Sequence, residues 1–296
     1  MTDTDTDTNI DSIGFVGLGN MGLPMARNLV EAGHDVVGVD VDEERLAAFE
    51  MVGGNTGGIA DAAAADVVVT MVRTPDQLRS VVRELYGEMD AGAVHMDTST
   101  VGPVATAAVA DRAAAAGIRL VDAPVSGGVQ GADAGTLTIM AGGETEDVEA
   151  AWPIFETLGE NTFHVGESGA GQTAKLCLQV LVGAEIVSIC EAFAVGAEAG
   201  LDPDTLYDVL TASIGSSGIL EAKGHRVVEE DYEPAANIDL QHKDMQLVMD
   251  AAERYDLPLY ATAAVTQTFV RARREGLGEL DQFAVFELFE SDRQDA

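Results

Sequence analysis

Lys175 is the residue of this 296-residue chain best placed for proton transfer. It lies three residues after a glycine-rich stretch, residues 166–172, and begins the second turn of a predicted long helix. A lysine can exchange a proton with an alcohol oxygen when burial or a neighbouring cation lowers its pKa. Only three of the 16 basic residues are lysines, so a lysine kept at this point favours a chemical role over a solvated charge.

A second chemical element is the run Ser126, Gly127 and Gly128. The backbone N–H groups of such a loop, together with the serine hydroxyl, can form an anion-binding nest. We therefore predict that these three residues bind a substrate carboxylate. The alternative interpretation is an ordinary glycine-rich turn.

A glycine-rich loop near the N-terminus predicts a dinucleotide site. Gly17, Gly19 and Gly22 form the pattern Gly-x-Gly-x-x-Gly between a predicted strand and a predicted helix. In that context the first glycine permits a tight turn, the second lets the backbone approach a pyrophosphate, and the third allows close helix–strand packing. Asp40 ends the second strand 23 residues after Gly17, where a carboxylate accepts the hydroxyls of the adenosine ribose.

The residues around Asp40 also bear on which cofactor binds. A carboxylate repels the 2′-phosphate of NADP, and Val41 stands where an arginine could have attracted it. We therefore predict that NAD is preferred over NADP. Arg45 and Arg73 are the residues that could reverse this preference; their other interpretation is two solvated charges.

Short β-branched runs alternate with helical patterns from residue 13 to about residue 165, which is typical of a parallel sheet wrapped by helices. The expected strands are residues 13–17, 36–40, 67–71, 93–97, 119–121 and 137–141. The expected helices between them are residues 21–31, 43–50, 76–85 and 104–116.

After Gly171 only helical periodicity remains, beginning with a long helix over residues 172–199. We therefore predict an α/β fold with an N-terminal Rossmann-like doubly wound parallel sheet, a long interdomain helix and an all-α C-terminal domain. The expected domains are a disordered acidic tail (residues 1–10), a dinucleotide-binding Rossmann domain (11–168) and an all-helical domain for substrate binding and dimerisation (169–296).

The charge of the chain excludes some classes of partner. Its 51 acidic and 16 basic residues give a net charge of −35, which makes nucleic acid and anionic membranes unfavourable partners. So large an acidic excess with so few lysines is typical of a halophile, in whose cytoplasm molar salt screens the repulsion. An acidic protein from a mesophile is the alternative.

The sequence also predicts a soluble, cytoplasmic protein that needs no metal. Residues 1–9 lack the basic and apolar regions of a secretory signal. The most apolar stretch, residues 176–199, contains three glutamates. The five histidines have no metal-ligand spacing. Cys177 and Cys190 fall in one predicted helix, where we expect two buried free thiols.

Taken in order, these motifs resemble the β-hydroxyacid dehydrogenase family, which includes 3-hydroxyisobutyrate dehydrogenase and tartronate semialdehyde reductase. The resemblance extends from residue 13 to residue 289. It includes the glycine loop, the pair Ser99-Thr100, the run Asp-Ala-Pro-Val-Ser-Gly-Gly over residues 122–128, and Lys175.

The resemblance implies an NAD(P)-dependent enzyme in which Lys175 takes the hydroxyl proton of a small β-hydroxyacid while hydride leaves for the nicotinamide. It implies that Ser126, Gly127 and Gly128 hold the substrate carboxylate, and that a homodimer or homotetramer forms through the helical half. The expected cofactor-binding residues are Gly17, Leu18, Gly19, Asn20, Met21, Gly22, Asp40, Met71, Val72, Thr100 and Lys243.

Two positions depart from the family pattern. Gln179 stands where the family has an asparagine that helps to orient lysine and substrate, and Arg73 stands where relatives often have proline. We expect Gln179 to contact the substrate, with its amide displaced by one methylene. The alternative functions are tartronate semialdehyde or glyoxylate reduction, an imine reductase, a 6-phosphogluconate dehydrogenase, and a non-catalytic dinucleotide sensor.

Overall fold

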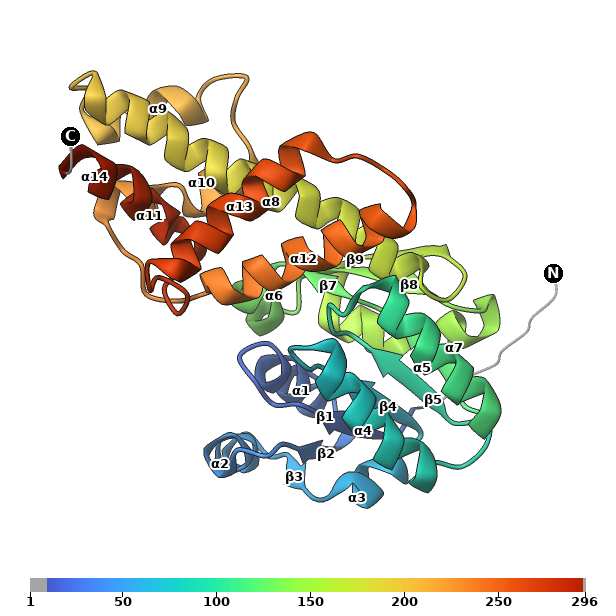
Figure 1. The fold of residues 1–296 in the computed structure, drawn as a ribbon. Helices are drawn as coiled ribbons and strands as arrows, with labels where there is room; N and C mark the ends of the chain where they lie inside the picture. The colour runs from blue at the N-terminus through green and yellow to red at the C-terminus, as the bar shows by residue number, and fades with distance from the viewer. Residues whose placement is uncertain (1–9, 295–296) are drawn as a thin grey trace, which may run out of the picture. The chain divides into compact units, whose positions relative to one another are not determined.

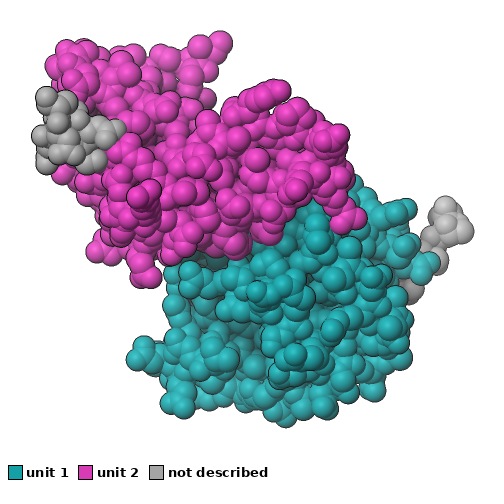
Figure 2. Space-filling view, viewed as in Figure 1, with its two compact units in different colours: residues 1–175 teal, residues 176–296 magenta. Residues whose placement is uncertain are grey.

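The computed structural model describes residues 10–294, with side chains described through residue 290 (Figure 1). All of the predicted acidic tail except Ile10 lies outside the described residues. The chain divides into two compact units, residues 1–175 and residues 176–296, which are coloured separately in Figure 2. The boundary falls inside a single helix, α8 (Ala170–Glu198), whose first residues belong to unit 1.

Unit 1 is built on a nine-stranded sheet with the order β3-β2-β1-β4-β5-β6-β8-β7, and β9 pairs with β8. The strands are β1 (Ser12–Val16), β2 (Asp35–Val39), β3 (Asn55–Thr56), β4 (Val67–Thr70), β5 (Val94–Asp97), β6 (Arg119–Asp122), β7 (Val125–Ser126), β8 (Leu137–Gly142) and β9 (Gly159–Gly166). The strands from β1 to β6 are parallel, as predicted, whereas β8 runs antiparallel to β6 and β7.

The six predicted strands are present, with ends that differ by one residue. Three further strands were not predicted. Strands β3 and β7 have two residues each, too few for a periodic pattern. Strand β9 is mostly exposed, so its sequence lacks the apolar alternation that identifies a half-buried strand.

Helices cover both faces of this sheet. Helices α1 (Gly22–Glu31), α6 (Gly128–Ala134) and α7 (Thr145–Leu158) bury Leu29, Ala132 and Ile154 in one core with Phe15 of β1. Helices α3 (Ile59–Ala63), α4 (Pro75–Glu88) and α5 (Gly102–Ala116) form a second core with Val68 of β4. Helix α2 (Glu43–Met51) follows β2. The unit is therefore doubly wound, which confirms the predicted fold class.

Unit 2 is helical. After the long helix α8 come α9 (Pro203–Thr211), α10 (Gly218–Lys223), α11 (His225–Glu229), α12 (Ile238–Arg254), α13 (Tyr260–Arg274), the 3-10 helix η1 (Gln282–Phe286) and α14 (Glu287–Gln294). Their core contains Phe193, Phe269 and Phe283. Among the described residues of unit 2 the only β pairing is an isolated bridge between Asn237 and Asp281, so the all-α prediction is confirmed.

Helix α8 is long and apolar. Of the described helices it alone is long and apolar enough to cross a membrane by length and composition, a test that core helices also pass. Only 39% of its most apolar window is buried within the chain. Cys177 is exposed on this helix, one turn before the exposed Leu181, so the prediction of two buried thiols is wrong for Cys177 and right for Cys190.

Candidate active site

The glycine loop between β1 and α1 is closed by contacts that only glycine permits. Gly17 has φ +100°, and its N–H donates to the carbonyl of Val39 at 2.8 Å. A Cβ atom on Gly17 would lie 2.2 Å from the carbonyl oxygen of Met71, and one on Gly22 would lie 1.9 Å from that of Gly17. A Cβ on Gly19 would meet no atom within 4 Å. The loop is thus packed tightly at its two ends and open in its middle, where a pyrophosphate needs room.

Asp40 is joined directly to this loop. Its Oδ2 accepts the Leu18 N–H at 2.6 Å and its Oδ1 accepts the Asp42 N–H at 3.0 Å. Arg45, on α2, donates to the Asn20 side-chain oxygen at 2.7 Å. The predicted ribose-binding carboxylate and one of the two arginines that bear on cofactor choice therefore lie at the same loop.

A second loop borders the glycine loop at the ends of β4 and β5. The N–H of Met71 donates to the carbonyl of Val16 at 2.9 Å, and the N–H of Val72 donates to the Ser99 hydroxyl at 2.9 Å. Ser99 is fully buried and Thr100 half-buried. The predicted cofactor contacts at Met71, Val72 and Thr100 thus share one edge of the sheet with Gly17.

A buried chain of side chains supports this second loop. The hydroxyl of Thr70 donates to Asp97 at 2.8 Å, so His95 Nε2 carries the ring proton and donates to Thr70 at 3.0 Å, while the Tyr86 hydroxyl donates to His95 Nδ1 at 2.7 Å. Burial lowers the pKa of His95 to about 3, and burial and the Asp97 charge raise the pKa of Tyr86. Asp97 also accepts the Ser99 N–H at 3.2 Å, so this chain of hydrogen bonds fixes the loop.

Ser126, Gly127 and Gly128 form the turn from β7 into α6. Gly127 has φ +137° and Gly128 has φ +62°, conformations that a residue with a Cβ atom rarely adopts. Ser126 is half-buried and the two glycines are exposed. The N–H groups that begin a helix have no partner within its own hydrogen-bond ladder, so this turn has the donors that a carboxylate requires.

The start of α8 is anchored by Asp122, which ends β6. One carboxylate oxygen accepts the Gly169 N–H at 2.6 Å and the other accepts the Gln172 N–H at 2.9 Å. Burial raises the pKa of Asp122 to about 7; these two hydrogen bonds oppose the rise and the Asp97 charge adds to it. Lys175 follows in the second turn of α8 and is only 8% exposed.

Unit 2 holds the remaining two predicted site residues, Gln179 and Lys243. The Gln179 amide donates to the Asp244 carboxylate, and the Lys243 ammonium lies 2.8 Å from the other oxygen of Asp244. Asp244 is 5% exposed. The structure thus joins Gln179 and Lys243 through a carboxylate that sequence reasoning did not assign to the site.

Three further residues were missed or left open by the sequence. Gln172 and Asp122 are buried polar residues whose position beside Lys175 and Ser126 is the only signal that could have singled them out. Arg73 is exposed, and its backbone N–H donates to Gln77. Within the part of the chain that the structure describes, no three His, Cys, Asp or Glu side chains are grouped as metal ligands.

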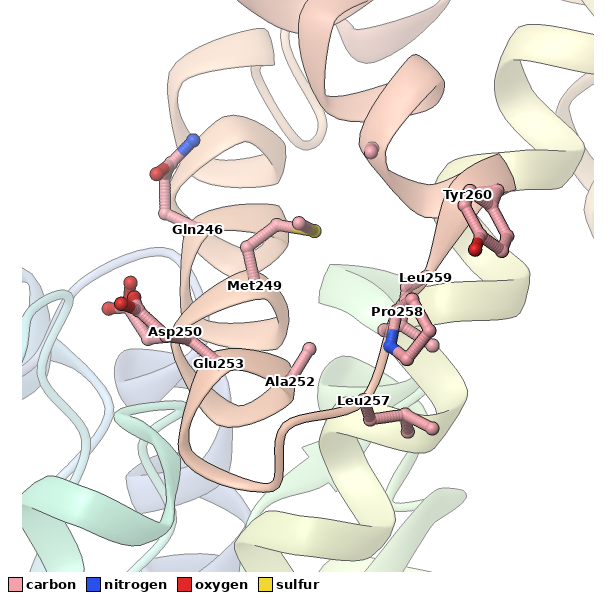
Figure 3. Close-up of a pocket in the computed structure, with 10 residues that line it drawn as sticks. Gln246, Met249, Asp250, Ala252, Glu253, Leu257, Pro258, Leu259 and Tyr260 are labelled. Atoms are coloured by element: carbon pink, nitrogen blue, oxygen red, sulfur yellow. The ribbon is translucent and has the colours of Figure 1, made fainter.

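A surface pocket of about 420 Å³ lies elsewhere in unit 2, between the end of α12 and the start of α13 (Figure 3). Gln246, Asp250 and Glu253 line it from α12, and Leu257 and Tyr260 line it from the connection and α13. It contains none of the predicted site residues, so we do not assign the chemistry to it.

Nearly the whole chain matches known protein families. Residues 12–166 match the NAD binding domain of 6-phosphogluconate dehydrogenase, and residues 169–289 match the NAD-binding domain of NADP-dependent 3-hydroxyisobutyrate dehydrogenase. The chain is 38% identical to 2-(hydroxymethyl)glutarate dehydrogenase of Eubacterium barkeri, over 94% of each chain. It is 35% identical to 2-hydroxy-3-oxopropionate reductase of Escherichia coli, over 94% of this chain and 97% of the relative.

Among solved structures, a 3-hydroxyisobutyrate dehydrogenase from Salmonella typhimurium superposes with a TM-score of 0.87 at 32% sequence identity, covering 94% of this chain and 99% of that one. Both domain models and full-length relatives thus agree on the family. The chain belongs to the family of NAD(P)-dependent β-hydroxyacid dehydrogenases.

Proposed function

We propose that this enzyme transfers hydride between a nicotinamide cofactor and 3-hydroxyisobutyrate or a closely related small β-hydroxyacid, with Lys175 as the general acid–base. The observation that carries the proposal is the placement of Lys175. It is buried in the second turn of a helix whose first turn is anchored to Asp122, four residues before Ser126.

In this proposal the Lys175 amine takes the proton of the substrate hydroxyl as the C–H bond of the carbinol carbon breaks. The cofactor, when bound, supplies the acceptor for the departing hydride. In the reverse direction the ammonium returns the proton to the carbonyl oxygen of the semialdehyde. Ser126, Gly127 and Gly128 bind the carboxylate, which fixes the carbon presented for transfer. Gln179, one helical turn after Lys175, contacts the substrate.

We also propose that NAD is preferred over NADP. Both oxygens of Asp40 accept backbone N–H groups, so the carboxylate is held at the loop where it would repel a 2′-phosphate. Arg45 could attract the same phosphate, because its hydrogen bond to Asn20 holds this positive charge at the loop. We also assign Thr100 to cofactor binding and Lys243 to the nicotinamide end of the cofactor.

The second candidate function is reduction of tartronate semialdehyde or glyoxylate. The 35% identity to a 2-hydroxy-3-oxopropionate reductase favours it. The 38% identity to 2-(hydroxymethyl)glutarate dehydrogenase adds a dicarboxylic hydroxyacid to the substrates that should be tested.

We further propose a cytoplasmic homodimer or homotetramer adapted to molar salt. The net charge of −35 supports the salt adaptation, because such a charge repels itself strongly at low ionic strength. The partly buried apolar helix α8, with Leu181 59% and Val195 71% exposed, supports a second copy as the partner of the helical half. Light scattering at several KCl concentrations would test both points.

The test of function is NAD(P)-linked turnover in about 2 M KCl, a salt concentration chosen for the acidic surface. Wild type and Lys175→Ala would be compared on a panel of small β-hydroxyacids and their semialdehydes. We expect turnover of a β-hydroxyacid that Lys175→Ala abolishes while cofactor binding survives. Tight cofactor binding without turnover of any panel member would instead favour a non-catalytic sensor.

A further inference from the structure

We propose that Gln172 is a positioning residue that fastens the start of α8, and with it Lys175, to the loop at Ser99 and Thr100. The proposal rests on the proposed function, because it assigns to Gln172 the alignment of the proton-transfer group with the cofactor-side loop. Nothing in the glycine-rich pattern before Lys175 requires a glutamine at this position for helix formation alone.

The side chain of Gln172 uses its whole amide to bridge these segments. Its Nε2 donates to the Ser99 carbonyl at 2.7 Å, and its Oε1 accepts the N–H groups of Val101 at 3.0 Å and Gly102 at 2.9 Å. Gln172 is fully buried. Three hydrogen bonds to the backbone of one loop, made in the absence of solvent, hold that loop at a fixed distance from α8.

The backbone of Gln172 is held as firmly as its side chain. Its N–H donates to Asp122, whose other carboxylate oxygen holds the Gly169 N–H. A Cβ atom on Gly171 would lie 2.3 Å from the Met140 carbonyl oxygen, and one on Gly142 would lie 2.7 Å from the Gly171 nitrogen. The start of α8 therefore sits directly on the ends of β6 and β8 with no room to shift.

Gln172 thus contacts two of the segments predicted to carry the chemistry. Its side chain reaches the loop of Ser99, its backbone reaches Asp122 at the start of the carboxylate-binding motif, and Lys175 lies three residues later on the same helix. Residues three apart are neighbours on one helix face, so the bridge and the lysine share a face of α8. Loss of the bridge would let the loop of Ser99 move relative to the first turn of α8, one turn before Lys175.

The first part of the test compares Gln172→Met with Thr106→Val in the proposed assay. Methionine preserves the buried volume and removes all three side-chain hydrogen bonds. Thr106 is the matched control, because it is buried in the same unit and its hydroxyl bonds to Gly102 within α5 alone. We expect Gln172→Met to lower kcat about 10- to 100-fold with KM changed less than about threefold, since small misplacements cost this much.

Two further readouts separate positioning from a general loss of stability. The primary deuterium isotope effect on kcat, with substrate labelled at the carbinol carbon, should rise in Gln172→Met and not in Thr106→Val, because the misaligned hydride transfer becomes slower than product release. Hydrogen exchange of the cofactor-free protein should accelerate about 10-fold or more in the peptide that contains Val101 and Gly102, whose N–H groups lose their acceptor. Gln172→Glu keeps an oxygen that can accept both N–H groups. Its kcat, isotope effect and exchange rate should therefore lie between those of wild type and Gln172→Met.

The outcomes distinguish this proposal from the function on which it rests. If wild type turns over no hydroxyacid, the proposed function fails, and the role of Gln172 fails with it. If wild type is active but Gln172→Met loses only thermal stability, as Thr106→Val does, with kcat and the isotope effect unchanged, then Gln172 is purely structural and this inference alone is overturned.

Discussion

The two units hold their predicted site residues by different means. In unit 1 the groups are fixed through the backbone: glycines at 17 and 22 allow main-chain atoms to touch, and Asp40 and Asp122 accept N–H groups. In unit 2, Gln179 and Lys243 are joined side chain to side chain, through Asp244. A site built from backbone contacts fails where an added Cβ would meet main-chain atoms, whereas a side-chain network fails by losing one charge. The predictions below test that difference.

The largest effect is expected from an added methyl group in the glycine loop. A Cβ on Gly22 would sit 1.9 Å from the Gly17 carbonyl oxygen, and neither backbone can yield without opening the β1–α1 turn. Gly22→Ala should destabilise unit 1 by on the order of 5 kcal/mol, the range of severe single substitutions. Denaturant unfolding followed by circular dichroism would measure it.

Gly19→Ala is the matched control for this loop, because its Cβ would meet no atom within 4 Å. It should leave the unfolding free energy within about 1 kcal/mol of wild type, the typical cost or gain of replacing a glycine. It should weaken NAD binding instead, because the methyl group projects into the space left for the pyrophosphate. Equal destabilisation by both substitutions would contradict the description of a loop packed at its ends and open in its middle.

This contrast also explains which parts of the site could be predicted from the sequence. The strands, the doubly wound sheet and the glycine loop could be predicted from the periodicity of apolar residues and from the spacing of glycines. Both signals lie within short stretches of sequence. The bonds from Gln172 to Ser99 and from Gln179 to Asp244 join residues 73 and 65 positions apart. Glutamine and aspartate are common on protein surfaces, so nothing in the neighbouring sequence marks Gln172 or Asp244 as buried.

The next effect in size is a pH dependence of unit 1 stability caused by Asp122. Its pKa is raised to about 7 in the folded protein from an ordinary value of 3.8, mainly by burial. Between those pH values the folded state binds a proton that the unfolded state has released, so stability falls as pH rises from about 4 to 7. The fall contributed by this group is on the order of 4 kcal/mol.

Asp122→Asn should remove this part of the pH dependence. Asparagine cannot ionise, and it keeps one acceptor for the start of α8, so the stability of the variant relative to wild type should rise between pH 4 and pH 7 by about the amount that wild type loses. Urea unfolding of wild type and variant from pH 4 to 8, at one fixed KCl concentration, gives the difference in slope. Parallel stability curves for the two proteins would show that Asp122 does not titrate in this range.

A smaller effect is expected in unit 2 from Asp244→Asn. The substitution preserves the shape of the residue but removes the charge that holds Lys243, and its amide group competes with the Gln179 amide as a donor. We expect kcat/KM to fall about 10- to 100-fold, which corresponds to roughly 1.4–2.7 kcal/mol of lost transition-state stabilisation. A melting temperature that changes far less in Asp244→Asn than in Gly22→Ala would support the difference between the two units.

The smallest effect concerns Arg45, a side-chain contact placed on the backbone-built loop of unit 1. Its bond to Asn20 is exposed, so its removal should cost little stability. Arg45→Ala should weaken NADP binding about 2- to 5-fold, an exposed charge contact worth up to roughly 1 kcal/mol, and leave NAD binding unchanged. Fluorescence titration with NAD and with NADP measures the ratio of the two affinities.

The effect of Arg45→Ala on NADP binding should also depend on salt. Since salt screens an exposed charge, this effect should shrink as KCl is raised, whereas the preference for NAD set by the backbone-held Asp40 should persist. Equal weakening of both cofactors would instead show that Arg45 acts by ordering Asn20 and the loop, which would make it part of the unit 1 framework.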